Sequence, residues 1–115
     1  MEKSRKLVEK IYKALEEKKG ENIKVLDISK VSTLADYFIL ADGNNINQVQ
    51  AMADEIEVSL EKEGMRPKQI EGYRSGSWIL MDYHDVVVHV FTKEDRQFYD
   101  LERIWMDASL VEMKQ

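Results

Sequence analysis

The sequence predicts an α/β fold in which a mixed sheet of about five strands is flanked by helices. Three observations support this class. The chain has 115 residues, near the usual size of one domain, so we treat residues 1–115 as a single domain. Apolar residues make up 43% of it, which is enough for a core. Helical and strand-like patterns follow one another in the order α-β-β-α-β-β-β-α, without internal repeats.

The first part of the chain predicts one helix and two strands. Apolar residues recur at helical spacing over about residues 4–19, and Gly20 is a suitable residue to end that helix. Residues 23–28 then form a run of roughly alternating apolar and polar positions, which is typical of a strand. A polar connection leads to residues 37–41, a short aromatic and β-branched run that predicts a second strand.

A second helix is predicted in the middle of the chain. Asn45 can cap its start, and Gln48 follows at the spacing of a capping box. Gly64 is a suitable end. The side chains predicted to be buried recur at helical spacing: Val49, Met52, Ala53, Ile56 and Leu60.

The last part predicts three strands and a helix. Residues 68–73 form a modest strand, while 78–81 and 86–91 are two apolar runs joined by a short turn, which predicts a hairpin covered on both faces. Thr92 begins a Thr-x-x-acid pattern that caps a final helix. The tail after Ala108 is expected to fray. The predicted buried stripe of the final helix is Phe98, Leu101, Ile104 and Trp105.

Composition excludes several classes of protein. The net charge of −5 and the pI of about 5.1 argue against direct, sequence-specific nucleic-acid binding driven by bulk charge. The absence of cysteine excludes disulfides, thiolate metal sites and a thiol nucleophile. No apolar run approaches the roughly 20 residues that cross a bilayer. Residues 1–19 carry seven Lys or Arg but also four Glu, so we expect a cytoplasmic protein whose first helix belongs to the fold.

The two histidines offer little for metal binding or catalysis. His84 lies in the predicted hairpin turn with Asp82 and Asp85, but short polar turns carry these residue types mainly for backbone reasons. His89 interrupts a valine-rich strand, where a buried imidazole held by one hydrogen bond is the simplest interpretation. The other interpretation is a polar contact on a binding face. We therefore predict no metal ion.

A nucleotidyltransferase is the enzyme that such a fold most readily suggests. Such enzymes need Gly-Ser or Gly-Gly at a helix start, together with alternating carboxylates that hold two Mg²⁺ ions. Here Gly43 is followed by Asn44, and the carboxylates Asp82 and Asp85 are three apart across a turn. No Gly-x-Ser-x-Gly elbow is present either. We expect a domain without catalytic residues and without a cofactor.

The remaining unusual chemistry lies between residues 71 and 91, where aromatic and acidic residues surround flexible turns. Trp and Tyr are frequent interface anchors, although a single Trp fills a core at least as often. The acidic surroundings favour a basic protein partner. The candidate partner-binding residues are Glu71, Tyr73, Trp78, Leu80, Asp82, Tyr83 and His89.

Four segments resemble the Iojap-like ribosomal silencing factors: residues 36–43, 71–72, 78–91 and 96–105. The resemblance covers about residues 4–108. Its most specific parts are the Trp-to-Phe block and the Arg…Tyr-x-Leu-Glu…Trp ending. His84 departs from the pattern, since Gly is commoner in that turn.

The resemblance implies a nucleotidyltransferase-like domain without enzymatic activity. It further implies binding to the large ribosomal subunit through ribosomal protein fourteen, at the face where the small subunit docks. Such binding would hinder subunit joining and lower translation when nutrients are scarce. Two other functions stay open: a phosphate-handling enzyme using Gly43 and Asp82, and an RNA binder using the basic first helix with Arg66, Arg74 or Arg96. A homodimer of the free chain is also left open.

Overall fold

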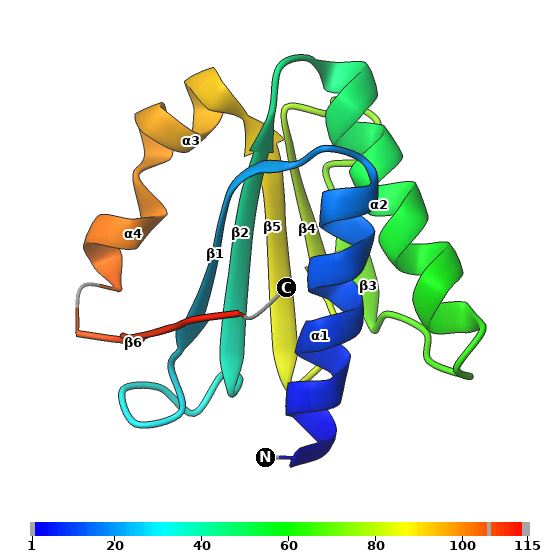
Figure 1. The fold of residues 1–115 in the computed structure, drawn as a ribbon. Helices are drawn as coiled ribbons and strands as arrows, with labels where there is room; N and C mark the ends of the chain where they lie inside the picture. Colours follow the sequence, from blue (N-terminus) through cyan, green and yellow to red (C-terminus); the bar gives the residue numbers. More distant parts are fainter. Residues whose placement is uncertain (1, 106, 114–115) are drawn as a thin grey trace.

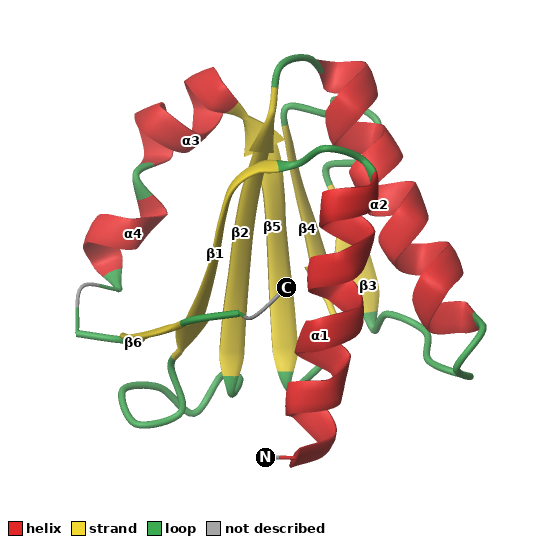
Figure 2. Cartoon of the chain, in the orientation of Figure 1, coloured by secondary structure: helices red, strands yellow, loops and turns green. Residues whose placement is uncertain are grey.

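The structure is a computed structural model that describes residues 2–105 and 107–113. Figures 1 and 2 show helices packed against one twisted sheet. In chain order the elements are α1 Glu2–Glu17, β1 Glu21–Asp27, β2 Tyr37–Gly43, α2 Ile46–Glu61, β3 Gln69–Glu71, β4 Trp78–Asp82, β5 Val86–Thr92, α3 Lys93–Tyr99, α4 Leu101–Ile104 and β6 Ser109–Val111. The predicted α/β class is confirmed.

The sheet is mixed and has six strands in the order β3-β4-β5-β2-β1-β6. Among the strands of the described residues, β2 and β5 run parallel, and the other neighbouring pairs are antiparallel. The sixth strand corrects the expectation of a frayed tail after Ala108, because Val111 pairs with Val25 at the outer edge of β1 (Figure 1). A strand of three residues carries too little periodicity to be predicted.

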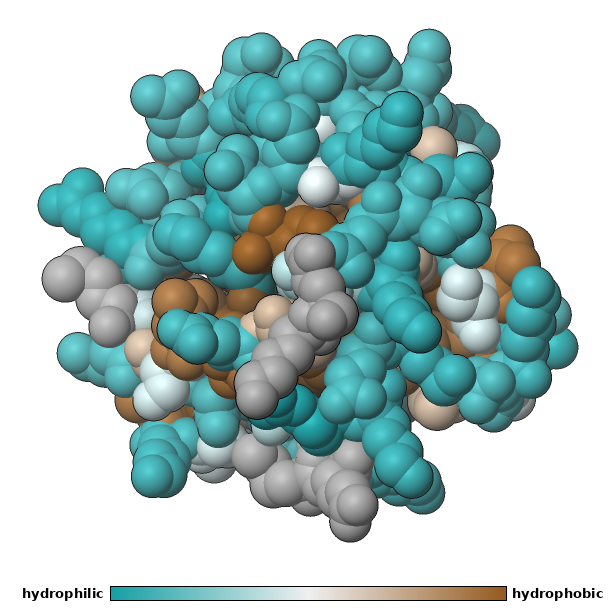
Figure 3. Space-filling model, in the orientation of Figure 1, coloured by the Kyte–Doolittle hydropathy of each residue, from teal (hydrophilic) through white to brown (hydrophobic). Residues whose placement is uncertain are grey.

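Each face of the sheet has its own apolar core. Alternate residues such as Ile39, Met81 and Val88 pack beneath α1 and α2. The residues between them, including Phe38 and Phe91, face the side that carries α3 and α4. In the view of Figure 3, where α1 lies in front of the sheet, the surface is mostly hydrophilic with a few separate apolar patches.

The first two helices largely follow the prediction. Asn45 caps α2, since its side chain accepts a hydrogen bond from the Gln48 amide at 2.8 Å, and all five predicted stripe residues of α2 are buried. Gly20 is a correction, because the left-handed residue after α1 is Lys19, with φ 60°. Gly20 instead allows close packing: a Cβ there would lie 2.8 Å from the sulfur of Met52.

The predicted final helix is broken in two. Asp100 adopts φ 49° and ψ 53°, a left-handed conformation that separates α3 from α4. Phe98 and Ile104, predicted to be buried, are 80% and 69% exposed, so that part of the prediction is wrong. The buried residue of α3 is Arg96. The helical spacing could not show this, because a single left-handed residue rotates the second half of the stripe away from the first.

The predicted hairpin is present, but its two strands differ in how they are covered. Every residue of β5 is buried, as expected for a central strand. Strand β4 alternates instead: Ile79 and Met81 are buried, whereas Trp78, Leu80 and Asp82 are half-buried. One face of β4 is therefore only partly covered, contrary to the expectation of two covered faces.

Candidate functional site

Five of the seven candidate residues lie on one face of the sheet. Residues paired directly across neighbouring strands share a face. Glu71 pairs with Leu80, and Leu80 pairs in turn with His89. Trp78 and Asp82 flank Leu80 at alternate positions on β4, so they point the same way. We call the part of this surface that is exposed or half-buried the open face: Gln69, Glu71, Trp78, Leu80 and Asp82.

Trp78 forms the inner edge of the open face and contacts the buried His89 of β5. The indole Nε1–H of Trp78 donates a hydrogen bond to Nδ1 of His89 at 3.1 Å. Because this indole nitrogen is only a donor, the imidazole must accept at Nδ1 and carry its proton on Nε2. Burial lowers the pKa of His89 to about 4, so the ring is neutral at pH 7. His89 is 5% exposed and acts on this face by holding Trp78 in place.

The two candidate tyrosines lie elsewhere. The hydroxyl of Tyr73 donates a hydrogen bond to Asp54 of α2 at 3.2 Å, which draws the ring to the helix-covered side of the sheet. Tyr83 is 6% exposed and belongs to the core beneath α1 and α2. Burial, followed by the nearby charge of Glu57, raises the pKa of Tyr83. Strand alternation could not predict either position, because both residues follow the end of a strand.

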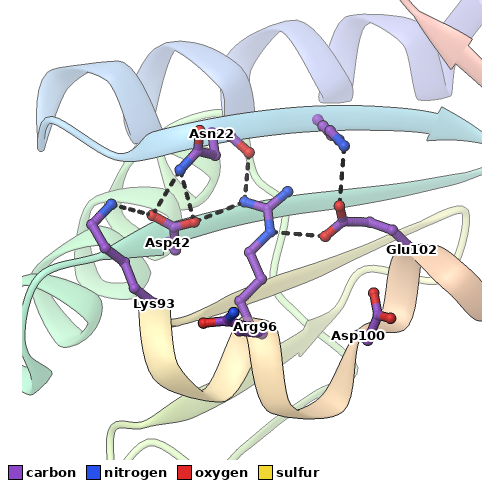
Figure 4. A pocket seen from close by; sticks show the side chains of 8 residues that line it. Asn22, Asp42, Lys93, Arg96, Asp100 and Glu102 are labelled. Carbon is purple, nitrogen blue, oxygen red and sulfur yellow. Dashed lines mark hydrogen bonds and ion pairs between the residues drawn. The ribbon is translucent and has the colours of Figure 1, made fainter.

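A buried ionic cluster, absent from the sequence analysis as a site, fixes α3 to the sheet (Figure 4). Arg96 pairs with Asp42 of β2 at 3.1 Å and with Glu102 of α4 at 2.8 Å, and it donates to the backbone carbonyl of Asn22. Lys93 reaches the other oxygen of Asp42 at 2.9 Å. This cluster lines an open hollow of about 460 Å³.

The pKa directions in this cluster follow from its contacts. The hydrogen bond to Asp42 raises the pKa of Lys93. Burial alone would raise the pKa of the Glu102 carboxyl, but hydrogen bonds from Arg96 and Lys24 outweigh it and leave that pKa lowered. The charges therefore satisfy one another within the protein. The cluster's clearest role is structural.

The residues proposed for a phosphate-handling enzyme do not share a site. Asp82 pairs with Val87, whereas Gly43 pairs with Thr92, five positions further along β5. At about 3.3 Å per residue the two groups lie roughly 16 Å apart along the sheet. The register therefore separates the helix start from the carboxylate that such an enzyme would bring together.

The hairpin turn has a backbone explanation. The carboxylate of Asp82 accepts a hydrogen bond from the His84 amide at 2.8 Å, and His84 itself has a left-handed φ of 71°. Within residues 2–105 and 107–113, no group of three or more acidic or histidine side chains is placed to hold a metal ion. No helix in the described part of the chain is long and apolar enough to cross a membrane.

Comparison with known proteins decides the family. The family model described as "Ribosomal silencing factor during starvation" matches residues 1–115. The chain belongs to the ribosomal silencing factor family. It is 39% identical over 111 residues to a ribosomal silencing factor of Halalkalibacterium halodurans, covering 96% of this chain and 95% of that protein. It is 43% identical to the Bacillus subtilis factor, covering 87% and 85%.

The chain is also similar to an organelle protein and to proteins whose structures have been solved. The chloroplast Iojap protein of Zea mays is 31% identical, over 90% of this chain and 45% of that protein. A crystal structure from Chromobacterium violaceum superposes with a TM-score of 0.87 at 35% identity, covering 96% of this chain and 89% of that one. A Bacillus halodurans structure gives 0.85 at 37%, covering 95% and 99%. The resemblance to this family seen in the sequence is confirmed.

Sequence reasoning missed one contributor to the open face. Tyr99, at the end of α3, places its ring 4.5 Å from that of Trp78, between centroids. Tyr99 is 45% exposed and extends the aromatic surface beyond β4. The Tyr-x-Leu-Glu segment of this silencing factor begins with Tyr99, but the sequence alone does not show that the fold places this tyrosine against the indole of Trp78.

Proposed function

We propose that this chain is a translational repressor that acts on the ribosome in the cytoplasm. It binds the large subunit through ribosomal protein fourteen, occupies the face where the small subunit docks, and so hinders subunit joining under nutrient limitation. The proposal rests on family membership for the class of target and on the open face for the place of contact. It requires no catalytic step.

The observation that carries the proposal is the composition of the open face. Leu80 offers apolar surface at its centre, and Trp78 offers an aromatic edge held by His89. Glu71 is exposed beside them, and Asp82 is half-buried. Apolar anchors with an acidic rim match a basic protein surface, since the anchors supply affinity and the rim charges supply steering.

Sedimentation with purified subunits tests the proposal. We expect the chain to pellet with large subunits and not with small ones, and to slow their joining. Leu80→Ser should weaken binding about 30-fold, the effect of losing a central anchor. Val58→Ser is the control, because Val58 is 51% exposed on α2, on the other side of the sheet. Equal sedimentation of both variants would reject the open face as the contact.

Trp78→Ala should also weaken binding, but Trp78 packs against Phe91 as well as against Tyr99. The binding of Trp78→Ala therefore has to be measured together with an unfolding curve, which shows whether the variant is still folded. A Trp78→Ala protein that folds normally and binds large subunits like the wild type would contradict the proposal.

The acidic rim makes a separate contribution. Glu71→Lys combined with Asp82→Lys should slow association strongly at low salt, where the Debye length is longest. The Leu80→Ser defect should change little with salt. Association rates measured across a salt series separate the two contributions. A wild-type rate for the double variant at low salt would remove these acids from the interface.

We further propose that the chain performs no nucleotide transfer. Calorimetry with ATP, GTP and CTP, with and without Mg²⁺, should give no heat of binding. Micromolar binding that is lost in Asp82→Asn would instead favour the enzyme hypothesis. We also propose that the free chain forms a homodimer, which sedimentation velocity over a concentration series would reveal.

A further inference from the structure

The junction of α3 and α4 exposes more apolar surface than a solvated helix pair needs. We call residues 97–104 the elbow. Its left-handed residue, Asp100, separates α3 from α4, and the two apolar side chains on either side of it are exposed: Phe98 by 80% and Ile104 by 69%. Between them lies an open hollow lined by Gln97, Phe98, Tyr99, Asp100, Arg103 and Ile104.

The elbow is continuous with the open face. The ring of Phe98 meets that of Tyr99 edge-on at 5.0 Å between centroids, and Tyr99 in turn meets Trp78 at 4.5 Å. The three rings therefore form one aromatic strip from β4 to the elbow. Since α3 and α4 lie over the same sheet face as Trp78 and Leu80, a protein seated on the open face would reach this strip.

The charges at the elbow indicate what the strip would contact. Asp100 is exposed and belongs to none of the ion pairs found among the described residues. A Lys or Arg side chain has a long apolar stem and a charged end. Its stem could pack on the rings of Phe98 and Tyr99 while its charge pairs with Asp100. Arg103, on the same hollow, disfavours a second cation there, which limits the elbow to one.

We infer that the elbow is a second contact for the partner of the open face, with Phe98 as its apolar anchor and Asp100 as the acceptor of one Lys or Arg side chain. The partner is a basic protein, and the inference rests on the proposed function for its identity as ribosomal protein fourteen. A centrally buried anchor of this size changes affinity by about 30-fold when it is truncated. Removing one rim charge mainly slows association.

The test uses the full chain with isolated ribosomal protein fourteen and with large subunits. Phe98→Ala should weaken binding of both about 30-fold, and Ile104→Ser should weaken it as well. Neither should lower the unfolding temperature, because both side chains are already in solvent. Asp100→Asn should slow association at low salt while keeping the fold, since Asn tolerates the left-handed conformation. Val58→Ala, on the other side of the sheet, is the control and should bind normally.

The outcomes separate this inference from the function it rests on. If Leu80→Ser loses binding while Phe98→Ala and Ile104→Ser bind normally, the elbow is not a contact and the proposed function stands. If only the elbow variants lose binding, the elbow is a contact and the open face is not. If all three bind like the wild type, both assignments fail. A loss shared by all three, with Val58→Ala unaffected, supports the whole strip.

Discussion

Replacing Arg96 by Met should destabilise the protein through the charge that it leaves behind. The Arg96 side chain is 9% exposed, and its partner Asp42 is 4% exposed. Met fills similar space but offers no donor. Of its partners among residues 2–105 and 107–113, the carboxylate of Asp42 would then keep Lys93, at 2.9 Å, and the side-chain amide of Asn22, at 3.2 Å. The carbonyl of Asn22 would also lose its donor.

The loss of stability in Arg96→Met can be estimated from these contacts. Removing one partner of a buried ion pair costs about 3 to 5 kcal/mol. Because Lys93 still neutralises Asp42, we expect the lower end, ~3 kcal/mol. The entropy of unfolding is about 2.1 cal/mol/K per residue, or ~0.24 kcal/mol/K for this chain, so the unfolding temperature should fall by ~12 °C. Arg96→Met with Asp42→Asn should recover part of this loss, since no buried charge is then left unpaired.

Thermal and urea unfolding followed by circular dichroism would measure these differences. Lys24→Met is a matched control, because Lys24 contacts the same Glu102 at 3.0 Å but is 45% exposed. An exposed pair contributes about 1 kcal/mol or less. The reasoning is refuted if Arg96→Met unfolds within 2 °C of the wild type, or if Lys24→Met is equally destabilised.

Three further outcomes can be checked by unfolding. Burial holds the pKa of His89 at about 4 in the folded state, against 6.5 in the unfolded chain. As the pH falls, the unfolded chain therefore takes up the proton first, and the free energy of unfolding decreases between pH 6.5 and pH 4. The urea midpoint should therefore drop between pH 7 and pH 5, and His89→Phe should remove most of that drop; an undiminished drop would assign it to other groups. Gly72→Ala should cost ~2 kcal/mol or more, because φ is 80° and the new Cβ would lie 2.2 Å from the carbonyl oxygen of Trp78; a wild-type melting temperature would contradict this. His84→Gly should stabilise by up to ~1 kcal/mol by relieving a left-handed φ of 71°, and a lower urea midpoint would show the opposite.

The sequence was most informative where a pattern was long. The stripe of α2 repeats over sixteen residues, and its cap and buried side chains could both be predicted. The valine-rich run of β5 likewise indicated a central strand. Short or single-residue features were not visible: β6 has three residues, and the break at Asp100 depends on one backbone conformation.

The candidate site was predicted in part, for a related reason. The sequence marked Trp78, Leu80 and Asp82 as candidate binding residues, but it put Asp82 in the turn and expected both faces of the 78–81 strand to be covered, so their common face on β4 is seen only in the structure. That Glu71 and His89 lie beside Leu80 depends on the register between strands, which no local pattern specifies. Phe98 and Ile104 were predicted as buried because their spacing is helical, whereas both are exposed in the structure and the left-handed Asp100 lies between them.

The pairing of β6 with β1 has a consequence for how the chain folds as it is made. Synthesis delivers the amino-terminal half first. Strand β2 then waits for its parallel neighbour β5, and the outer edge of β1 stays unpaired until Val111 arrives beside Val25. Unpaired edges of apolar strands invite pairing with other chains. A growing chain therefore exposes two unpaired strand edges, and the surface built on β4, β5 and α3 takes its final shape only after residues 93–99 have been made.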